Sequence, residues 1–123
     1  MKQFLFTALM WLAFFSPAKS QQLKSPNGKF VMEFTLQNDG TPSYSLNYKN
    51  KAVVKPSKLG LELKNDKKSL LNDFTVVDSK ATTFDENWQP VWGEVASIRN
   101  HYNELAVTLN QKETDRQILI RFR

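Results

Sequence analysis

Apolar and polar residues alternate along much of this chain with a period of two. In the segment 30–36 (FVMEFTL), the apolar Met32 and Phe34 share one face, which is typical of a half-buried strand. The same pattern predicts further strands at 44–48, 52–54, 59–63, 74–77, 105–109 and 118–122. After residue 20, no window of about eleven residues or more repeats its apolar positions with a helical period. We therefore expect an all-β chain.

Turn residues separate these segments at intervals of roughly 8–12 residues. Asp39-Gly40 is a strong hairpin signal, and the segment 25–28 (SPNG) combines residues that favour turns. Because Pro56 cannot donate a ladder hydrogen bond, we expect the strand at 52–54 to end just before it. Short strands in this arrangement predict an antiparallel β-sandwich or a barrel.

The first twenty residues have the pattern of a signal peptide. A positive start precedes the apolar run 4–15, and the small-x-small residues 18–20 form a cleavage site. A membrane anchor is the alternative, but the run is short and Pro17 interrupts it. We expect a signal peptide at 1–20, one small domain at 21–123 and no membrane contact after cleavage. The chain contains no cysteine, so it lacks disulfides; this fits a bacterial periplasm.

Charge narrows the range of partners only slightly. The whole chain carries +5, and removal of Lys2 and Lys19 leaves 15 basic against 12 acidic residues, or +3. These basic residues are scattered, whereas a nucleic-acid surface shows a concentrated stripe. We expect a solvated exterior and no nucleic-acid partner.

The segment 84–109 differs from the strands around it because polar and aromatic residues are concentrated there. It holds two of the three tryptophans, the only histidine and four carboxylates: Trp88, Trp92, His101, Asp85, Glu86, Glu94 and Glu104. Carboxylate pairs perform glycoside hydrolysis, but they are also common surface residues and could pair with Arg99. A single histidine near carboxylates is a weak metal signal, and a hydrogen-bonding role for it is the simpler interpretation.

The aromatic side chains of this segment allow two interpretations. Trp88, Trp92 and Tyr102 could stack on pyranose rings, or a tryptophan could fill the sandwich core or a domain interface. Pro90 predicts an irregular loop between the tryptophans, and loops often carry binding. The segment 100–104 (NHYNE) is dense in hydrogen-bonding groups, so we expect a network that closes on itself or meets another domain.

Three stretches resemble the N-terminal domain of glycoside hydrolase family 97, which includes the periplasmic α-glucosidase of starch-utilisation systems. They are 25–29 (SPNGK), 56–63 (PSKLGLEL), and 84–94 (FDENWQPVWGE) together with 98–104 (IRNHYNE). The resemblance implies a β-super-sandwich of the galactose-mutarotase-like type, followed by a (β/α)8 catalytic barrel and a C-terminal β domain. It also implies hydrolysis of α-glucosides or α-galactosides with calcium assistance. The family's catalytic and calcium positions fall outside this chain, so the resemblance implies no catalytic or metal residue here.

From the resemblance we predict an N-terminal sandwich that supports a missing catalytic barrel and is inactive alone. The candidate residues for a buried interface or a sugar-site wall are Trp88, Trp92, Glu94, Arg99, His101, Asn103 and Glu104. The barrel of the same enzyme is the expected partner, and an α-linked oligosaccharide is a possible second one. Because the alternating pattern runs to Arg123, we also expect the sequence to be a fragment. The alternatives are a free-standing sugar-binding module and a purely structural exported β-protein.

Overall fold

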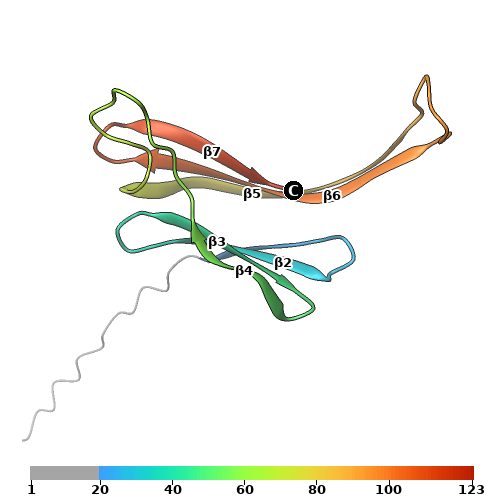
Figure 1. Cartoon of the computed structure of the whole chain (residues 1–123), viewed down its shortest axis with the longest axis horizontal. Coiled ribbons are helices and arrows are strands. Elements are labelled where there is room, and N and C mark those ends of the chain that lie inside the picture. Colours follow the sequence, from blue (N-terminus) through green and yellow to red (C-terminus); the bar gives the residue numbers. More distant parts are fainter. Residues whose placement is uncertain (1–19) are drawn as a thin grey trace, which may run out of the picture.

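The computed structural model describes residues 20–123, which form two antiparallel sheets stacked face to face (Figure 1). The first sheet has the strand order β1-β2-β3-β4, and the second has the order β5-β6-β7. The strands are β1 Gln21–Lys24, β2 Phe30–Leu36, β3 Pro42–Tyr48, β4 Lys51–Lys58, β5 Phe74–Trp88, β6 Ile98–Gln111 and β7 Arg116–Phe122. The prediction of an all-β antiparallel sandwich is confirmed.

The first sheet is a meander whose turns follow the turn residues of the sequence. Strands β2 and β3 pair in an unbroken register from Phe30↔Tyr48 to Leu36↔Pro42. The Asp39-Gly40 turn joins them, and Gly40 has the positive φ of 76° that such turns require. The Asp39 carboxylate accepts hydrogen bonds from the Thr41 backbone N–H and hydroxyl, both at 2.9 Å. The predicted hairpin is therefore present.

Strand β4 does not end before Pro56, as the sequence led us to expect. It continues to Lys58, with Ser57 opposite Tyr44 and Val54 opposite Leu46. Two residues of β4 thus lie opposite Ser45 alone, which makes a bulge. Proline is tolerated at bulges and on edge strands, and β4 is an edge strand.

The predicted strand at 59–63 is also wrong. Leu61 forms only an isolated bridge with Leu70, with hydrogen bonds of 3.0 and 2.9 Å, inside the irregular connection 59–73. This connection carries the chain from the first sheet to the second. Alternating leucines cannot form a sheet strand without a neighbouring strand in reach, so here Leu59 and Leu63 pack against the core and Leu61 stays largely exposed.

Strands β5 and β6 form one long hairpin rather than several short strands. They contain 15 and 14 residues and pair from Phe74↔Gln111 to Trp88↔Ile98. A single register shift near Val76 interrupts the pairing. The sequence predicted only the ends of these strands, because polar residues hide the alternation in between.

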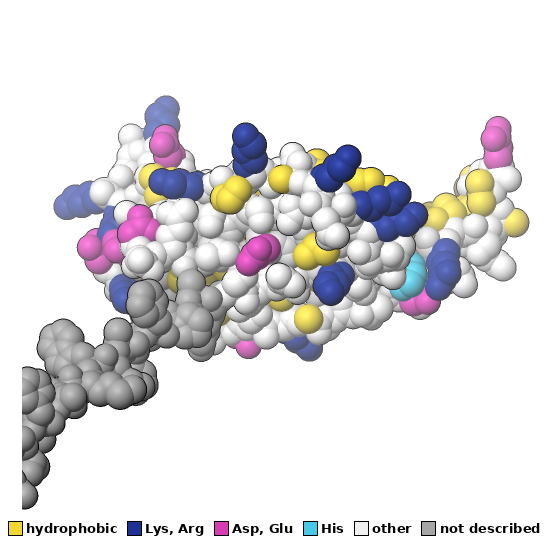
Figure 2. Space-filling view, turned by 90° about the horizontal axis from the view of Figure 1, so that it is seen from below, with side chains coloured by type: hydrophobic (Ala, Val, Ile, Leu, Met, Phe, Trp, Pro, Cys, Tyr) yellow, Lys and Arg dark blue, Asp and Glu magenta, His cyan; other side chains and the backbone are white. Residues whose placement is uncertain are grey.

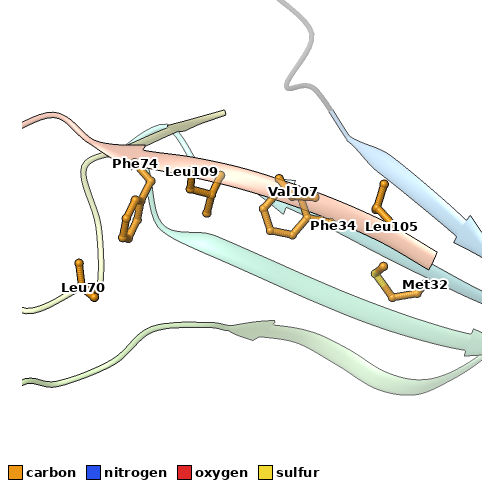
Figure 3. Packing of buried hydrophobic residues seen from close by; sticks show 7 residues of the cluster. All are labelled: Met32, Phe34, Leu70, Phe74, Leu105, Val107 and Leu109. Atoms are coloured by element: carbon orange, nitrogen blue, oxygen red, sulfur yellow. The ribbon is translucent and has the colours of Figure 1, made fainter. Parts of the chain in front are cut away.

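The core lies between the two sheets and is small. Its buried apolar residues come from β2, β5, β6 and the connection between the sheets (Figure 3): Met32, Phe34, Leu70, Phe74, Leu105, Val107 and Leu109. Phe34, Val107 and Leu109 are completely shielded from solvent. The Phe122 ring packs near Phe34, with centroids 5.9 Å apart. This packing holds the second sheet over β2 and β3.

Polar contacts attach the connection 59–73 to the second sheet. The side-chain amide of Gln111, which is fully buried, donates to the carbonyls of Ser69 at 3.0 Å and Asn72 at 3.2 Å. Lys68 pairs with Asp73 and Glu113. These contacts hold the connection in place, although the bridge between Leu61 and Leu70 is its only β-type backbone pairing.

We expect Gln111→Leu to lower the free energy of unfolding by about 1–3 kcal/mol, because it removes a buried amide that donates to two partly buried carbonyls, without shrinking the side chain much. The measurement is urea denaturation followed by fluorescence. Gln117→Leu is the matched control, since Gln117 is exposed on β7 and its replacement should change stability by less than about 0.5 kcal/mol. Equal effects of the two substitutions would contradict the role of the Gln111 amide.

The predicted signal peptide at 1–20 falls, apart from Ser20, outside the described residues. Within the part that the structure does describe, no helix is long and apolar enough to cross a membrane.

Candidate functional site

The distal half of the β5–β6 hairpin projects from the sandwich and is called the arm here. It comprises residues 84–88 of β5, the irregular turn 89–97 and residues 98–102 of β6. Strand β7 is shorter than β6 and pairs with it only as far as Leu105. Beyond that point the arm continues as a ribbon of two strands (Figure 1). A two-stranded ribbon is marginally stable alone, so this element needs support from elsewhere.

One face of the arm continues the core-facing side of the second sheet. Leu105 points into the core, and residues two apart along a strand share a face, so His101 and Arg99 lie on this side. Their cross-strand partners are Asp85 and Asn87. Figure 2, seen from the side of the first sheet, shows charged side chains and the single histidine along the arm. We call this the polar face.

The strongest contact on the polar face joins Arg99 to Asp85. The guanidinium Nε donates to Oδ1 of Asp85 at 2.8 Å, and one terminal nitrogen donates to Oδ2 at 2.7 Å. Two parallel bonds of this kind fix the orientation of both groups. The hydrogen bonds from Arg99, with its charge, hold the pKa of Asp85 below its ordinary value of 3.8. Since both side chains are about half exposed, the pair adds little stability and instead sets the charge pattern of the face.

We expect Arg99→Gln to raise the pKa of Asp85 back towards 3.8. Because the folded pKa lies below the unfolded one, the pair stabilises the fold above the unfolded pKa, and this contribution is lost as the pH falls through the lowered folded value. The measurement is a carbon-13 NMR titration of the Asp85 carboxyl group. An unchanged midpoint in Arg99→Gln would show that the ion pair does not form in solution.

The opposite face and the turn of the arm carry exposed apolar side chains, although the hydrogen-bonded Glu86 and Asn100 lie between them on that face. Phe84 stacks on Tyr102 with ring centroids 4.9 Å apart and planes tilted by 23°. Further along, Trp88 pairs across the ribbon with Ile98, and 49% of its surface is exposed. In the turn, Trp92 is 88% exposed and Val91 is 90% exposed. The arm thus presents three exposed aromatic residues, Phe84, Trp88 and Trp92, and several aliphatic ones to its surroundings.

The base of the arm is tied to the sandwich by polar contacts. Asn103 donates from its amide to the carbonyl of Lys24 in β1 at 2.7 Å, and its carbonyl accepts from the Thr83 hydroxyl at 2.8 Å. Glu104 is buried and accepts from Nε of Arg123 at 2.6 Å. The guanidinium of Arg123 also lies 5.4 Å from the centroid of the Tyr102 ring. These contacts set the direction in which the arm leaves the two sheets.

The seven residues chosen from the sequence therefore fall into three groups along one hairpin. Trp88, Trp92 and Glu94 lie at or near the tip and are exposed, Arg99 and His101 lie on the polar face, and Asn103 and Glu104 form the base. Neither tryptophan contributes to the core. The hydrogen-bonding groups of 100–104 form separate contacts instead of one closed buried network. Their role in an interface or a sugar-site wall stays a prediction.

Sequence reasoning missed two residues that shape the arm. Phe84 stacks on Tyr102, which the sequence suggests only as a partner for a sugar ring, and Arg123 neutralises the buried Glu104. The hairpin register would have revealed the pairing of Phe84 with Tyr102, since the numbers of residues opposite one another sum to 186 throughout the arm, as in Phe84↔Tyr102 and Trp88↔Ile98. No feature of the sequence pointed to Arg123.

The carboxylates of the segment do not form a catalytic pair with one another. Asp85 is bonded to Arg99, Glu86 accepts from the Asn100 amide at 3.0 Å, and Glu104 is bonded to Arg123. Among residues 20–123, no group of three or more His, Cys, Asp or Glu is placed to hold a metal ion. The described residues therefore do not fit the calcium implied by the family resemblance.

Comparison with solved structures finds the same fold in glycoside hydrolases. A glycoside hydrolase family 97 enzyme from Pseudoalteromonas sp. strain K8, in complex with panose or with acarbose, is 29% identical and superposes with a TM-score of 0.75. The match covers 83% of this chain and 15% of that chain. A β-arabinopyranosidase is 22% identical over 84% of this chain and 16% of its own, with a TM-score of 0.70, which shows a shared fold.

The family described as Glycosyl-hydrolase 97 N-terminal matches residues 23–123, which is nearly all of the part that the structure describes. The match includes both sheets and the whole arm. It confirms the resemblance seen in the motifs of 84–94 and 98–104. This chain belongs to the glycosyl-hydrolase 97 N-terminal family.

Proposed function

We propose that this chain is the N-terminal sandwich of an exported α-glycosidase, and that its arm docks against the catalytic domain of the same polypeptide. The chain itself performs no chemistry in this proposal; it braces the catalytic domain and helps to wall the sugar site. The chain spans 15% of the length of the Pseudoalteromonas enzyme, so most of such an enzyme lies outside it. The observation that carries the proposal is the uncovered apolar tip of the arm.

The exposure of the tip is unfavourable for a ribbon that ends in water. Val91 and Trp92 are about 90% exposed, and burying a large apolar side chain contributes about 1.5–3 kcal/mol. Aromatic residues are enriched in the cores of interfaces and often act as hot spots there. The arm projects from the sandwich in one direction (Figure 1), so a single neighbouring domain could cover its tip.

The polar face of the arm is suited to a sugar site. Asp85, Arg99, His101 and the Asn87 amide present donors and acceptors side by side on the ribbon. Sugar hydroxyls need such groups in fixed positions, and the two bonds between Arg99 and Asp85 fix two of them. Panose and acarbose are bound by the similar Pseudoalteromonas enzyme, so we propose an α-linked oligosaccharide as the substrate of the intact enzyme.

The test uses the full-length enzyme that contains this chain. We expect Trp92→Ala to lower kcat/KM and the melting temperature of the catalytic domain, because a hot-spot aromatic residue contributes about 2 kcal/mol or more to an interface. Val53→Ala is the matched control, since Val53 is 59% exposed on β4, far along the chain from the arm. Arg99→Gln should affect kcat/KM more than the melting temperature if it lines the sugar site. Unchanged folding and kinetics in both arm variants would contradict the proposal.

A free-standing sugar-binding module is a second candidate, favoured by the 88% exposure of Trp92. A flat aromatic surface of this kind can stack on a pyranose ring without any help from another domain. Titration of the isolated chain with maltooligosaccharides, followed by tryptophan fluorescence, separates the two candidates. Binding that is lost in Trp92→Ala would favour the module, whereas no response favours the docking role.

Export to the periplasm belongs to the same proposal. It is supported by the apolar run 4–15 and the absence of cysteine. N-terminal sequencing of the protein recovered from a bacterial periplasm tests it, with Gln21 as the expected first residue. Any calcium that assists catalysis would be held by other parts of the enzyme, since residues 20–123 provide no ligand group.

A further inference from the structure

Asn27-Gly28 is the only Asn-Gly pair in the chain, and it lies in the turn between β1 and β2 (Figure 1). An asparagine side chain can react with its own backbone when the nitrogen of the next residue attacks the side-chain carbonyl carbon. Glycine favours this attack because it has no Cβ atom beside that nitrogen. Both residues are exposed, and a Cβ atom at Gly28 would meet no atom within 4 Å. The turn therefore has room for the movement that the attack requires.

The turn holds the side-chain carbonyl of Asn27 between two donors. Its oxygen accepts a hydrogen bond from the Ser25 hydroxyl at 2.7 Å and another from the Lys29 backbone N–H at 3.0 Å. A backbone N–H can only donate, so the atom that faces Lys29 is the oxygen, and the amide nitrogen lies on the other side of Cγ. Two donors polarise the carbonyl and would stabilise the negative charge that develops on its oxygen when a nucleophile adds to Cγ.

A hydrogen bond within the turn opposes the attack. The Gly28 N–H donates to the Ser25 carbonyl at 2.8 Å, and this bond must open before the nitrogen can react. Because Gly28 is exposed, water replaces the bond when it opens, so the net cost of opening is small.

The Asp39-Gly40 turn has the same spacing but a different environment. Gly40 is buried, and a Cβ atom there would lie 2.8 Å from two backbone atoms of Asp73. The Asp39 carboxylate accepts two hydrogen bonds from Thr41, which hold its pKa below its ordinary value of 3.8. It therefore stays ionised, and an anion is a poor target for a nucleophile. Of these two turns, the reaction is expected only at Asn27.

We propose that Asn27 is a spontaneous modification site that deamidates through a cyclic imide, and that its isoaspartate product loosens the support of the arm. The Gly28 nitrogen bonds to Cγ of Asn27 while the bond from Cγ to the side-chain nitrogen breaks. The side-chain nitrogen leaves as ammonia and takes the proton of the Gly28 N–H. Water then opens the ring: cleavage at Cγ gives aspartate, and cleavage at the former backbone carbonyl gives isoaspartate, whose main chain runs through Cβ and Cγ. Water is the only other reactant.

The turn supports the arm through β1. This strand has four residues at the edge of the first sheet and pairs with β2. Its Lys24 carbonyl accepts the hydrogen bond from Asn103 at the base of the arm, and the hairpin is closed by the Ser25 N–H, which donates to the Phe30 carbonyl at 3.0 Å. Isoaspartate adds one carbon to the main chain inside this closure and displaces the oxygen that accepts from Lys29. We therefore expect the pairing of β1 to weaken.

The test ages the purified full chain in mildly alkaline buffer and maps its tryptic peptides by mass spectrometry. Trypsin cuts after Lys24, Lys29 and Lys49, so the segments 25–29 and 30–49 are separated. Isoaspartate is labelled by enzymatic methylation of its free α-carboxylate. We expect it to form at least about tenfold faster in 25–29 than in 30–49. The rate should rise with pH, because the attacking nitrogen must lose its proton. Equal rates in the two segments, or no isoaspartate in 25–29, would overturn the proposal.

Two variants check the reacting groups. Gly28→Ala should slow the reaction, because the added methyl group shields the attacking nitrogen. Asn27→Gln should form no isoaspartate in 25–29, because a glutamine side chain cannot give this product. Both residues are exposed in a turn, so neither substitution should unfold the chain. Isoaspartate in 25–29 of Asn27→Gln would place the reaction elsewhere and contradict the proposal.

Hydrogen exchange followed by NMR tests the effect on the arm's support. We expect the amides of β1 that bond to β2 to exchange at least about tenfold faster in the isoaspartate form than in the unmodified chain. Asn27→Asp is the matched control, since it carries the same added charge without the extra main-chain carbon, and its exchange should stay close to that of the unmodified chain. Equal exchange in all three forms would overturn the role of isoaspartate. Neither measurement depends on docking of the arm, so the proposed function stands or falls separately.

Discussion

Phe34→Ala is expected to lower the free energy of unfolding by about 3–5 kcal/mol, the range for removing a large aromatic side chain from a core. The Phe34 side chain is completely buried between the sheets, where its ring lies 5.9 Å from that of Phe122. Its removal would leave a cavity that the small core around it can fill only in part. A domain of this size has a total stability of about 5–15 kcal/mol, so the variant should be close to unfolding. Urea denaturation followed by circular dichroism measures the change.

Phe30→Ala is the matched control for this experiment. Phe30 lies in the same strand, but 41% of its surface is exposed, and it packs on the ring of Tyr48 at 4.7 Å instead of in the core. Its replacement should cost about 1 kcal/mol. A loss for Phe34→Ala as small as this would mean that the two sheets do not pack around Phe34 in solution.

Gly40→Ala is expected to destabilise the fold by about 2–5 kcal/mol, for two reasons that add. Gly40 has a φ of 76°, where a residue with a Cβ atom is strained by about 1–2 kcal/mol. A Cβ atom there would also lie 2.8 Å from two backbone atoms of Asp73 and closer still to the nitrogen of Phe74. The Gly40 carbonyl accepts from the Phe74 N–H at 3.1 Å, so the clash would separate the turn of the first sheet from the start of the second. Thermal unfolding of purified variants measures the loss.

Gly28→Ala separates the two causes of this effect. Gly28 has a similar φ of 67°, but a Cβ atom there would meet no atom within 4 Å. Its replacement should therefore cost only the conformational strain of about 1–2 kcal/mol. If both alanine variants lose the same stability, the close approach of Gly40 to β5 does not matter in solution.

These stability effects matter for function because the arm depends on the sandwich. The arm grows out of β5 and β6, and its base is held by Asn103 against β1 and by Glu104 against Arg123. A variant that loosens the packing of the two sheets would also change the direction of the arm. The effect of an arm variant on function can therefore be assigned to the arm only when the variant has the same free energy of unfolding as the unmodified chain.

The sequence by itself determined those strands and turns that are specified by residues close together along the chain. Alternation in the segment 30–36 predicted β2, and Asp39-Gly40 predicted the hairpin that follows it. The motifs of 84–94 and 98–104 indicated the family, because such motifs can be recognised without any knowledge of the fold. Such features depend on side-chain spacing and turn chemistry, which are visible along the chain itself.

The tertiary structure decided the elements whose neighbours are distant in sequence. Pro56 could remain within β4 only because β4 lies at a sheet edge, and Leu59 and Leu63 could not form a strand because no strand lies beside them. The polar segment 84–104 became a projecting ribbon because β5 and β6 pair beyond the end of β7. Pairing partners and solvent exposure are properties of the assembled sheets, so the sequence could name the residues of the arm but not its two faces.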